Sequence, residues 1–405
     1  MAHIKVTDIA DLVVLLPYQL GFHPADSLVL ADLTGNRIHG VARVDLGEVR
    51  SREVAAQCLA PLVRDGARSV LLAAWEETPG SAARALDHAC RAAADLGVEV
   101  VLELLVSDGR FWSSDEDEPP EGRPVPEPAA VTAVAELVAL GIAPLPGRAS
   151  LAGLVEASPG SRTDDVAEAV VRRRGRRRTS WSSPSARKEW RMHLSAAAVG
   201  TDALPTPHRT AVLAVALLDR DWRDGIIAWL CTGSLPLDAL GRGVVPDLVG
   251  MPRIPRPPGR NDPPAPEVGA DPHRRLRLVG SRDRHPADGT EWEDVGDGDA
   301  WDADPADDGR AIGSPGSACG PWVLDGTEAR AVLEVLLQLC RDLRDETEDV
   351  AAAALTTAAH VAWWLGDGAL ARTALERALR VAPGYRLAEL FETVVADGIR
   401  PARLA

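Results

Sequence analysis

The chain has 405 residues with 44 basic and 60 acidic side chains, which gives a net charge of −16, and 46% of its residues are hydrophobic. This length and composition allow about two or three globular domains and exclude collagen, coiled-coil and disulfide-scaffold proteins. The acidic balance argues against a general coat for nucleic acid and against a protein that binds anionic membranes.

Several features predict a cytoplasmic protein without a membrane segment. The five cysteines show no metal-ligand or redox-motif spacing, which favours free thiols in a reducing compartment. The first residues lack the basic and apolar pattern of a signal peptide. The most apolar stretch, residues 350–366, is short for a bilayer span, so we expect it to be a buried core helix.

The first 160 residues predict an α/β domain. We expect strands at residues 27–33, 38–46, 69–75 and 98–107. We expect helices at residues 51–64, 81–96, 129–140 and 150–157. Because strands alternate with helices after the first hairpin, the pattern predicts a mostly parallel sheet with helices packed on it.

The rest of the ordered chain predicts an all-helical C-terminal domain. Apolar residues recur at helical intervals over residues 163–200, 207–219, 222–231, 326–344, 347–364, 367–381 and 385–396. The small residues Gly366, Ala371 and Ala378 follow the spacing of a tetratricopeptide-like helical hairpin. Because a solenoid needs about three such units and one is visible, we expect a single hairpin inside a helical bundle.

Between the two helical regions, residues 246–321 predict a disordered insert. Prolines cluster at 252–266, and residues 281–309 hold eleven acidic side chains against two arginines. Such a segment buries too little apolar surface to offset the entropy lost on ordering. The predicted order along the chain is an α/β domain (1–160), a helical region (161–245), the insert (246–321) and a second helical region (322–405) that packs with the first.

One long motif resembles a known family. Residues 17–29 read PYQLGFHPADSLV, and the second predicted strand ends with Arg43-Val44-Asp45. Further stretches of the same kind are DGRFW at 108–112, PEGRP at 120–124, RD at 223–224, WLGDG at 364–368 and PGYRLA at 383–388. Together they resemble an actinobacterial domain-of-unknown-function family whose opening signature is P-Y-x-L-G-F-x-P-x-D-S-L-V.

The resemblance implies a shared fold and an actinobacterial source, but no activity. Lysine occurs only at Lys5 and Lys188 and asparagine only at Asn36 and Asn261, a bias typical of a high-GC genome. Relatives carry cysteines after the stretch that corresponds to residues 108–112, whereas residues 113–118 read SSDEDE here. No metal or thiol role is therefore carried over to this chain.

The first hairpin predicts a polar cluster at one edge of the sheet. A turn centred between Gly35 and Asn36 pairs Ser27 with Val44 and brings His23 and Asp26 near Arg43 and Asp45. If the two later strands run parallel to the second hairpin strand, their C-terminal ends share this edge, where open α/β sheets bind ligands. The candidate ligand-binding residues are His23, Asp26, Ser27, Arg43, Asp45, Asp108 and Arg110.

Two interpretations of this edge stay open. An imidazole, several carboxylates and two guanidinium groups suit acid–base chemistry, a divalent ion or a phosphate clamp. Alternatively, Asp26 and Ser27 satisfy turn amides, and Arg43 pairs with a carboxylate across the edge. The sequence lacks a Ser-His-Asp order, a Gly-rich phosphate loop and an H-E-x-x-H motif, which favours the structural interpretation.

A run of arginines forms a second candidate site. It consists of Arg172, Arg173, Arg174, Arg176, Arg177 and Arg178. Basic residues followed by tryptophans, here Trp181 and Trp190, suit a nucleic-acid surface. A run of like charge is more often a solvated helix face, and the acidic insert offers an intramolecular partner. We expect the solvated or intramolecular role and keep nucleic acid as the alternative.

Taken from the sequence alone, the favoured function is a ligand-sensing or protein-interaction module. The sheet edge would bind a small anionic molecule, and the C-terminal helices would meet a protein partner. The alternative is a hydrolase that uses His23, Asp26, Asp45 and Asp108. The sequence predicts no metal site and no membrane association, implies no particular cofactor, and leans away from an enzyme.

Overall fold

The computed structural model describes residues 8–34, 37–114, 119–139, 143–175, 182–200, 204–235, 244–249, 251–255 and 326–401. All of them belong to one compact unit, formed by residues 1–260 and 321–405. Residues 256–325, which include most of the expected insert, lie outside the described residues. The expected boundaries between domains stay predictions.

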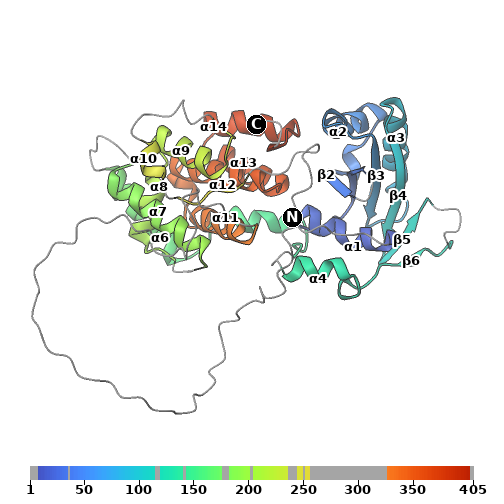
Figure 1. The fold of residues 1–405 in the computed structure, drawn as a ribbon, viewed down its shortest axis with the longest axis horizontal. Helices are drawn as coiled ribbons and strands as arrows, with labels where there is room; N and C mark the ends of the chain where they lie inside the picture. The colour runs from blue at the N-terminus through green and yellow to red at the C-terminus, as the bar shows by residue number, and fades with distance from the viewer. Residues whose placement is uncertain are drawn as a thin grey trace, which may run out of the picture. The chain divides into compact units, whose positions relative to one another are not determined.

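The N-terminal part of the chain forms a six-stranded sheet (Figure 1). Its strands are β1 (Ser27–Thr34), β2 (Arg37–Asp45), β3 (Ser69–Glu76), β4 (Glu99–Ser107), β5 (Arg110–Ser113) and β6 (Arg123–Pro124). They lie in the order β2-β1-β3-β4-β5-β6, so that β1 and β3 are central. The helices of this region are α1 (Ile9–Leu20), α2 (Arg52–Arg64), α3 (Ala83–Asp95) and α4 (Thr132–Ala139).

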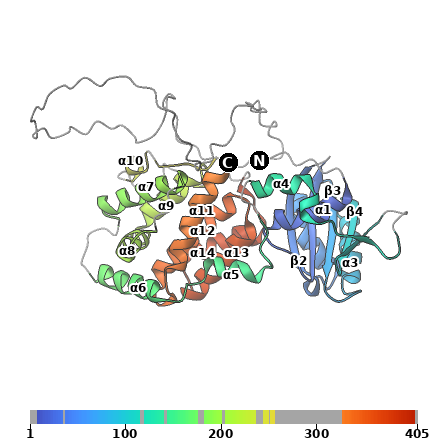
Figure 2. The ribbon, with the colours of Figure 1, turned by 90° about the horizontal axis from the view of Figure 1, so that it is seen from below.

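Helices cover both faces of this sheet (Figure 2). On one face, α2 and α3 bury Leu59 and Ala89 against Leu30 and Leu72 of the central strands. On the other face, α1 packs Leu16 against the alternate residues of the same strands, and α4 packs on α1. Continuous apolar runs such as residues 69–75 form central strands because both of their faces are covered.

The expectation of a mostly parallel sheet was wrong. Strands β3 and β4 pair in parallel, whereas β1 pairs antiparallel with both β2 and β3, and the pairs β4–β5 and β5–β6 are antiparallel. The cause is the position of β1, because the connection through α2 places β3 beside β1 rather than beside β2. Strands β2, β3 and β4 still run in one direction, as the sequence predicted.

The register of the first hairpin also differs from the expectation by one residue. Leu33 pairs with Ile38 as predicted, but a bulge follows, and Ser27 pairs with Asp45 instead of Val44. His39 is the additional residue of the bulge, since Leu33 and Asp32 pair with Ile38 and Gly40. Because side chains alternate along a strand, such a slip changes which residues face each other across the hairpin.

The remaining described elements are helices. They are α5 (Ala149–Val155), α6 (Ser161–Arg174), α7 (Pro184–Ala198), α8 (Pro207–Ala216), α9 (Arg220–Leu230), α10 (Val245–Leu248), α11 (Gly326–Arg341), α12 (Asp349–Trp364), α13 (Gly368–Val381) and α14 (Arg386–Ala396). The prediction of a helical C-terminal region is confirmed. Helices α12 and α13 form a hairpin; its likeness to a tetratricopeptide unit stays a prediction.

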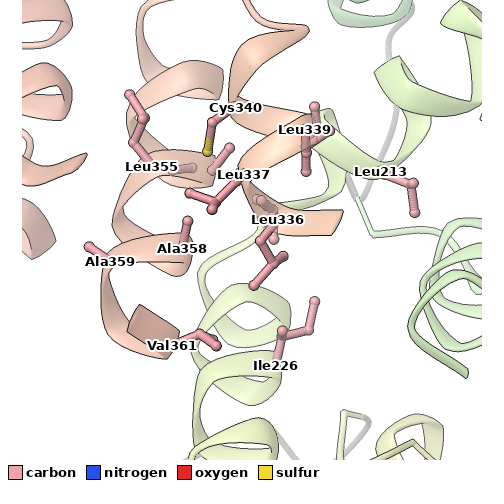
Figure 3. Packing of buried hydrophobic residues seen from close by; sticks show 14 of the residues in the cluster. Leu213, Ile226, Leu336, Leu337, Leu339, Cys340, Leu355, Ala358, Ala359 and Val361 are labelled. Carbon is pink, nitrogen blue, oxygen red and sulfur yellow. The ribbon is translucent and has the colours of Figure 1, made fainter. Parts of the chain in front are cut away.

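Helix α12 is the centre of the helical core. The helices α8, α9, α11, α13 and α14 contact it, and every residue from Val350 to Trp364 is buried. Figure 3 shows Leu336 and Leu337 of α11 and Ile226 of α9 close to Ala358 and Val361 of α12. The expectation that the apolar stretch 350–366 is a buried core helix is therefore confirmed. Within the described part of the chain, no helix is both long and apolar enough to cross a bilayer.

Candidate functional site

The predicted sheet edge exists, and part of the predicted cluster gathers there. Strands β2 and β3 end at Asp45 and Glu76, and Asp26 precedes β1 at the same edge. His23 lies nearby in the chain and is exposed; its backbone amide donates to the carbonyl oxygen of Leu145, at 2.9 Å. The edge therefore brings together Asp26, Ser27, Arg43 and Asp45.

Arg43 uses its guanidinium group within this cluster. Its Nε donates to the Ser27 hydroxyl at 2.8 Å, and one terminal nitrogen lies 2.6 Å from an Asp45 carboxylate oxygen. The same nitrogen lies 3.4 Å from the carbonyl oxygen of Ala25. The other Asp45 oxygen lies 3.5 Å from Arg148. Arg43 is thus an ion-pair partner within the fold, as the structural interpretation predicted.

Asp26 joins the start of β1 to the ends of β2 and β3. Its φ is +39°, in the left-handed region where aspartate is tolerated better than most residues. A carboxylate oxygen accepts the backbone N–H of Glu77 at 2.9 Å, and its carbonyl accepts that of Leu46 at 2.8 Å. Asp26 therefore satisfies backbone amides at the sheet edge.

Asp108 and Arg110 do not join this cluster. Between β2 and β4 lie β1 and β3, so Asp45 and Asp108 are separated by about 14 Å, three strand spacings. Asp108 and Gly109 have φ values of +46° and +70° and form the two-residue turn between β4 and β5. Because Asp45 ends β2 and Asp108 follows β4, with two strands between them, the predicted hydrolase cluster is not assembled with Asp108.

The arginine run is described only in part. Arg172 lies 2.9 Å from Glu168 on the same helix, and Arg174 lies 3.9 Å from Asp349. Arg173 is buried, with 8% of its surface exposed. Arg176, Arg177 and Arg178 lie outside the described residues. The first half of the run thus places one arginine in the protein interior and two beside carboxylates.

A groove of about 490 Å³ opens between α3 and the strands β4 and β5. Its lining includes the acidic residues Asp87 and Glu103, the thiol of Cys90, the indole of Trp112, and the hydroxyls of Ser113 and Ser114. Asp87 and Cys90 come from α3, Glu103 from β4, and the other three from β5 and its end. These residues lie far apart in the sequence, and only the packing of α3 on the sheet brings them together, so no sequence motif marks the groove.

One wall of the groove is held in place by the predicted residue Arg110. Its guanidinium group donates to the carbonyl oxygens of Glu121 and Gly122, the latter at 2.7 Å. The Trp112 indole N–H donates to the carbonyl oxygen of Pro120 at 3.1 Å. The loop before β6 is thereby fixed against β5, so Arg110 helps to position the indole ring of Trp112.

Gly122 allows the loop to approach Trp112 this closely. Its φ is +70°, and a Cβ atom at this position would lie 2.5 Å from the indole ring and 2.9 Å from the carbonyl oxygen of Phe111. Only glycine adopts this backbone and leaves that space. The motif stretches DGRFW and PEGRP therefore meet as one hairpin, in which Arg110 pairs with Pro124 and Phe111 with Arg123.

The floor of the groove carries a negative charge. The Cys90 thiol donates to a Glu103 carboxylate oxygen at 3.1 Å. Burial, the hydrogen bond to Glu103 and the charges of Glu103 and Asp87 raise the pKa of the Cys90 thiol to about 12. Cys90 is thus a neutral thiol at physiological pH and not a nucleophile, while the carboxylates carry the charge.

Within the described ranges, no three His, Cys, Asp or Glu side chains gather in a way that would hold a metal ion. The lining of the groove offers a carboxylate, hydroxyls and an indole ring. Its half-buried carboxylate, flanking acidic residue and aromatic wall are the features that a cationic group requires.

Comparison with known families identifies the chain. A family model described as a domain of unknown function, DUF4192, matches residues 10–238 and 321–402. The chain therefore belongs to this family, which confirms the predicted resemblance to a domain-of-unknown-function family. The match omits residues 239–320, the stretch that contains most of the expected insert. No curated protein and no solved structure matches the chain significantly.

Proposed function

We propose that the chain, whose family has no assigned activity, is a binding module that recognises a lysine or arginine side chain of a protein partner. The groove between α3 and β5 takes this side chain. The observation that supports the proposal is Glu103, a half-buried carboxylate whose side-chain hydrogen-bond partner is the thiol of Cys90. A thiol is a weak donor, so the carboxylate retains acceptor capacity for a stronger one.

The chemistry of the groove fits such a ligand. A guanidinium or ammonium group pairs with the Glu103 carboxylate. Asp87 at the rim pairs with Arg91 of the same helix at 2.9 Å, so the attraction comes mainly from Glu103. The indole of Trp112 offers an aromatic surface on which a cation is stabilised. The Ser114 hydroxyl accepts the backbone N–H of Glu103 at 3.4 Å and so helps to fix Glu103 in the groove. A volume of about 490 Å³ accommodates a side chain with its flanking backbone.

The anionic ligand expected at the sheet edge receives less support. Arg43, its best candidate for binding an anion, already pairs with Ser27, Ala25 and Asp45. A hydrolase built on His23, Asp26, Asp45 and Asp108 would require Asp108 to approach across the two intervening strands. Nucleic-acid binding by residues 172–178 would draw on Arg173, which is buried.

Binding of blocked tripeptides tests the proposal. The probes are Gly-Arg-Gly and Gly-Lys-Gly, with Gly-citrulline-Gly as a neutral control of the same shape as the arginine peptide. We expect the two cationic peptides to bind and the citrulline peptide to bind at least roughly tenfold more weakly, because charge-assisted hydrogen bonds contribute about 1.5–3 kcal/mol. Equal binding of all three peptides, or none, would contradict the proposal.

A matched pair of variants assigns the binding to the groove. Glu103→Gln removes the carboxylate of the groove, whereas Glu99→Gln makes the same change at an exposed position of the same strand. Glu103→Gln should weaken binding of the arginine peptide at least roughly tenfold, and Glu99→Gln should leave it within about twofold. If both variants weaken binding equally, the attraction is a general charge effect and the groove is not the site.

Other parts of the functional assignment rest on the sequence. A cytoplasmic location is proposed from the free cysteines without motif spacing, and an actinobacterial source from the composition and the family resemblance. A protein contact through the C-terminal helices stays a proposal from the sequence alone.

A further inference from the structure

Residues 397–400, here called the latch, follow α14 and lie against the α/β region. The backbone carbonyl oxygen of Asp397 accepts an N–H of the Arg64 side chain, at the end of α2, at 3.0 Å. Gly398 has a φ of +62°, and a Cβ atom there would lie 2.6 Å from the side chain of Pro61 in the same helix. The latch thus makes a close contact with α2, although it continues the chain of the helical region.

Arg400 extends this contact to the edge of the sheet. Its Nε lies 2.7 Å from a carboxylate oxygen of Asp65, and one terminal nitrogen donates to the carbonyl oxygen of His39 in β2 at 2.6 Å. The other terminal nitrogen lies over Gly40, where a Cβ atom would be 1.6 Å away. Because β2 is the first strand in the order of the sheet, the guanidinium group covers part of a sheet edge.

The other side of the latch is anchored in the helical region. The indole N–H of Trp363 in α12 donates to the carbonyl oxygen of Ile399 at 2.8 Å. The backbone N–H groups of Gly398 and Ile399 donate to the carbonyl oxygens of Val395 and Val394 at the end of α14, both at 3.1 Å. Because these bonds join the latch to α12 and α14, it moves as part of the helical region.

A second junction between the two regions is built differently. Phe22, which precedes β1, is 1% exposed and packs in the helical core. The backbone groups of Gly21 and His23, on either side of it, exchange hydrogen bonds with Leu145 at 2.8 and 2.9 Å. This junction is therefore apolar, buried and flanked by backbone hydrogen bonds.

The latch holds the α/β region mainly through polar groups. Its four residues are all at least partly exposed, and only the following Pro401 is buried. Contacts with few buried apolar groups and with exposed hydrogen bonds open at a low cost in free energy. The buried residues of the helical core and those of the sheet form separate clusters, and Phe22 crosses between the regions. Each core can therefore stay intact when the latch opens.

We infer that the latch is a releasable contact that closes the helical region onto the edge of the sheet. When it opens, Arg400 leaves Asp65 and His39, and the two regions part about the junction at Phe22 while each stays folded. The opening uncovers the edge of β2. The groove of the proposed function lies at α3, β4 and β5, so the latch does not depend on it.

The distance between two spin labels tests the inference in the full chain. Noncanonical amino acids carry the labels at Gln57 of α2 and Glu392 of α14, both exposed, so that the native cysteines remain. Pulsed electron–electron double resonance gives the distribution of distances. We expect one dominant short distance in the wild type. In Arg400→Gln, the ratio of open to closed molecules should rise at least roughly tenfold, because charge-assisted hydrogen bonds are lost.

Gly40→Ala opens the latch from the opposite side, since its methyl group takes the place of the Arg400 guanidinium group. It should also add the longer distance. Gly47→Ala adds a methyl group where nothing lies within 4 Å and should leave the distribution unchanged. Neither glycine has a positive φ, so alanine strains neither backbone. Arg386→Gln removes an exposed charge that pairs with Glu389 of the same helix, and it should also change nothing.

Three results would overturn the inference. The first is a distance distribution in Arg400→Gln and Gly40→Ala that equals that of the wild type. The second is a longer component of equal size in the two control variants. The third is loss of the helical circular dichroism signal in Arg400→Gln and Gly40→Ala, which would show that the latch belongs to one cooperative core. Because the groove is tested with cationic peptides, failure here leaves the proposed function unaffected.

Discussion

In the α/β region, the buried carboxylates Asp32 and Glu76 lie within about two residues of the ends of β1 and β3. The helical region instead places Arg377, Asp342 and His360 inside its core. We therefore expect the two regions to respond differently to the loss of a polar side chain. Such a substitution, or a change of pH, should lower the free energy of unfolding more when it acts in the helical core than when it acts in the α/β region.

Arg377 should give the largest loss of stability. It is 1% exposed, and it donates to the carbonyl oxygens of Cys340 and Leu343 at 3.0 and 2.7 Å and to that of Val155. It thereby joins the ends of α5 and α11. Arg377→Met leaves these three carbonyl oxygens without their donor and removes the ion pairs with Asp345 and Glu156. We expect the free energy of unfolding in urea to fall by about 3–5 kcal/mol.

The control for this prediction lies on the same helix. Arg380 is exposed and pairs with Glu156. Arg380→Met removes the same charge. Because exposed ion pairs contribute little, the free energy of unfolding should change by less than about 1 kcal/mol. Similar losses for the two variants would show that buried charge does not distinguish the helical core.

The pH dependence of stability should come mainly from His360. Its ring is buried and stacks on Phe391 with centroids 3.5 Å apart, and its Nδ1 lies 3.0 Å from the carbonyl oxygen of Thr356. Burial, helped by the charge of Arg223, lowers the pKa of His360 to about 4 from an ordinary value of 6.5. The folded state therefore prefers the neutral ring, and its stability is complete above the unfolded pKa.

As the pH falls through 6.5 toward 4, the unfolded chain gains a proton that the folded chain does not bind. The free energy of unfolding should decline by about 2 kcal/mol between pH 7 and pH 5. Urea unfolding at a series of pH values measures this slope. His360→Gln lacks the titrating ring and should give a flatter profile; an unchanged slope in this variant would assign the pH effect to other groups.

In the α/β region, substitution of Gly122 should lower the stability by a smaller amount. Gly122→Ala combines a positive φ with a contact of 2.5 Å to Trp112, so we expect a loss of roughly 1–3 kcal/mol. Gly109 has the same φ of +70°, but nothing lies within 4 Å of an added Cβ, so Gly109→Ala isolates the backbone strain. Thermal unfolding should place Gly122→Ala below Gly109→Ala, and the reverse order would show that the loop is not packed against the indole.

Of these substitutions, Asp45→Asn should change the free energy of unfolding least. Asp45 is 43% exposed, and Arg43 keeps its bonds to Ser27 and Ala25 without it. The loss should be below about 1 kcal/mol, because exposed ion pairs contribute little. Urea unfolding of the wild type and the variant measures this difference. A loss of about 3 kcal/mol or more, the cost of breaking a buried ion pair, would contradict it.

The sequence was sufficient to predict the helices, because amphipathic periodicity is local. Helices α11 to α14 lie within about three residues of the expected ranges, and Trp363 and Trp364 are buried as expected. The strand order could not be predicted in this way. Nothing in the apolar run at 69–75 specifies that it pairs with β1 rather than with β2, since that choice depends on the crossover of α2.

One wall of the groove, strand β5, carries a signal in the sequence. Asp108-Gly109 is a strong signal for a two-residue hairpin turn, and it would have predicted that residues 110–113 return as a strand. Arg43 and Asp45 were predicted to be neighbours, and they are. The bond between Cys90 and Glu103 was not accessible, because it joins a helix to a strand through tertiary packing.

The groove is tested most directly by the indole N–H resonance of Trp112, assigned in ¹⁵N-labelled protein by its loss in Trp112→Phe. The resonance should shift saturably when the Gly-Arg-Gly peptide is added, because a cation beside Glu103 lies against the indole wall. The shift should be absent with the citrulline peptide and in Glu103→Gln. An arginine peptide that binds without moving this resonance, while shifting other indole signals, would contradict the account.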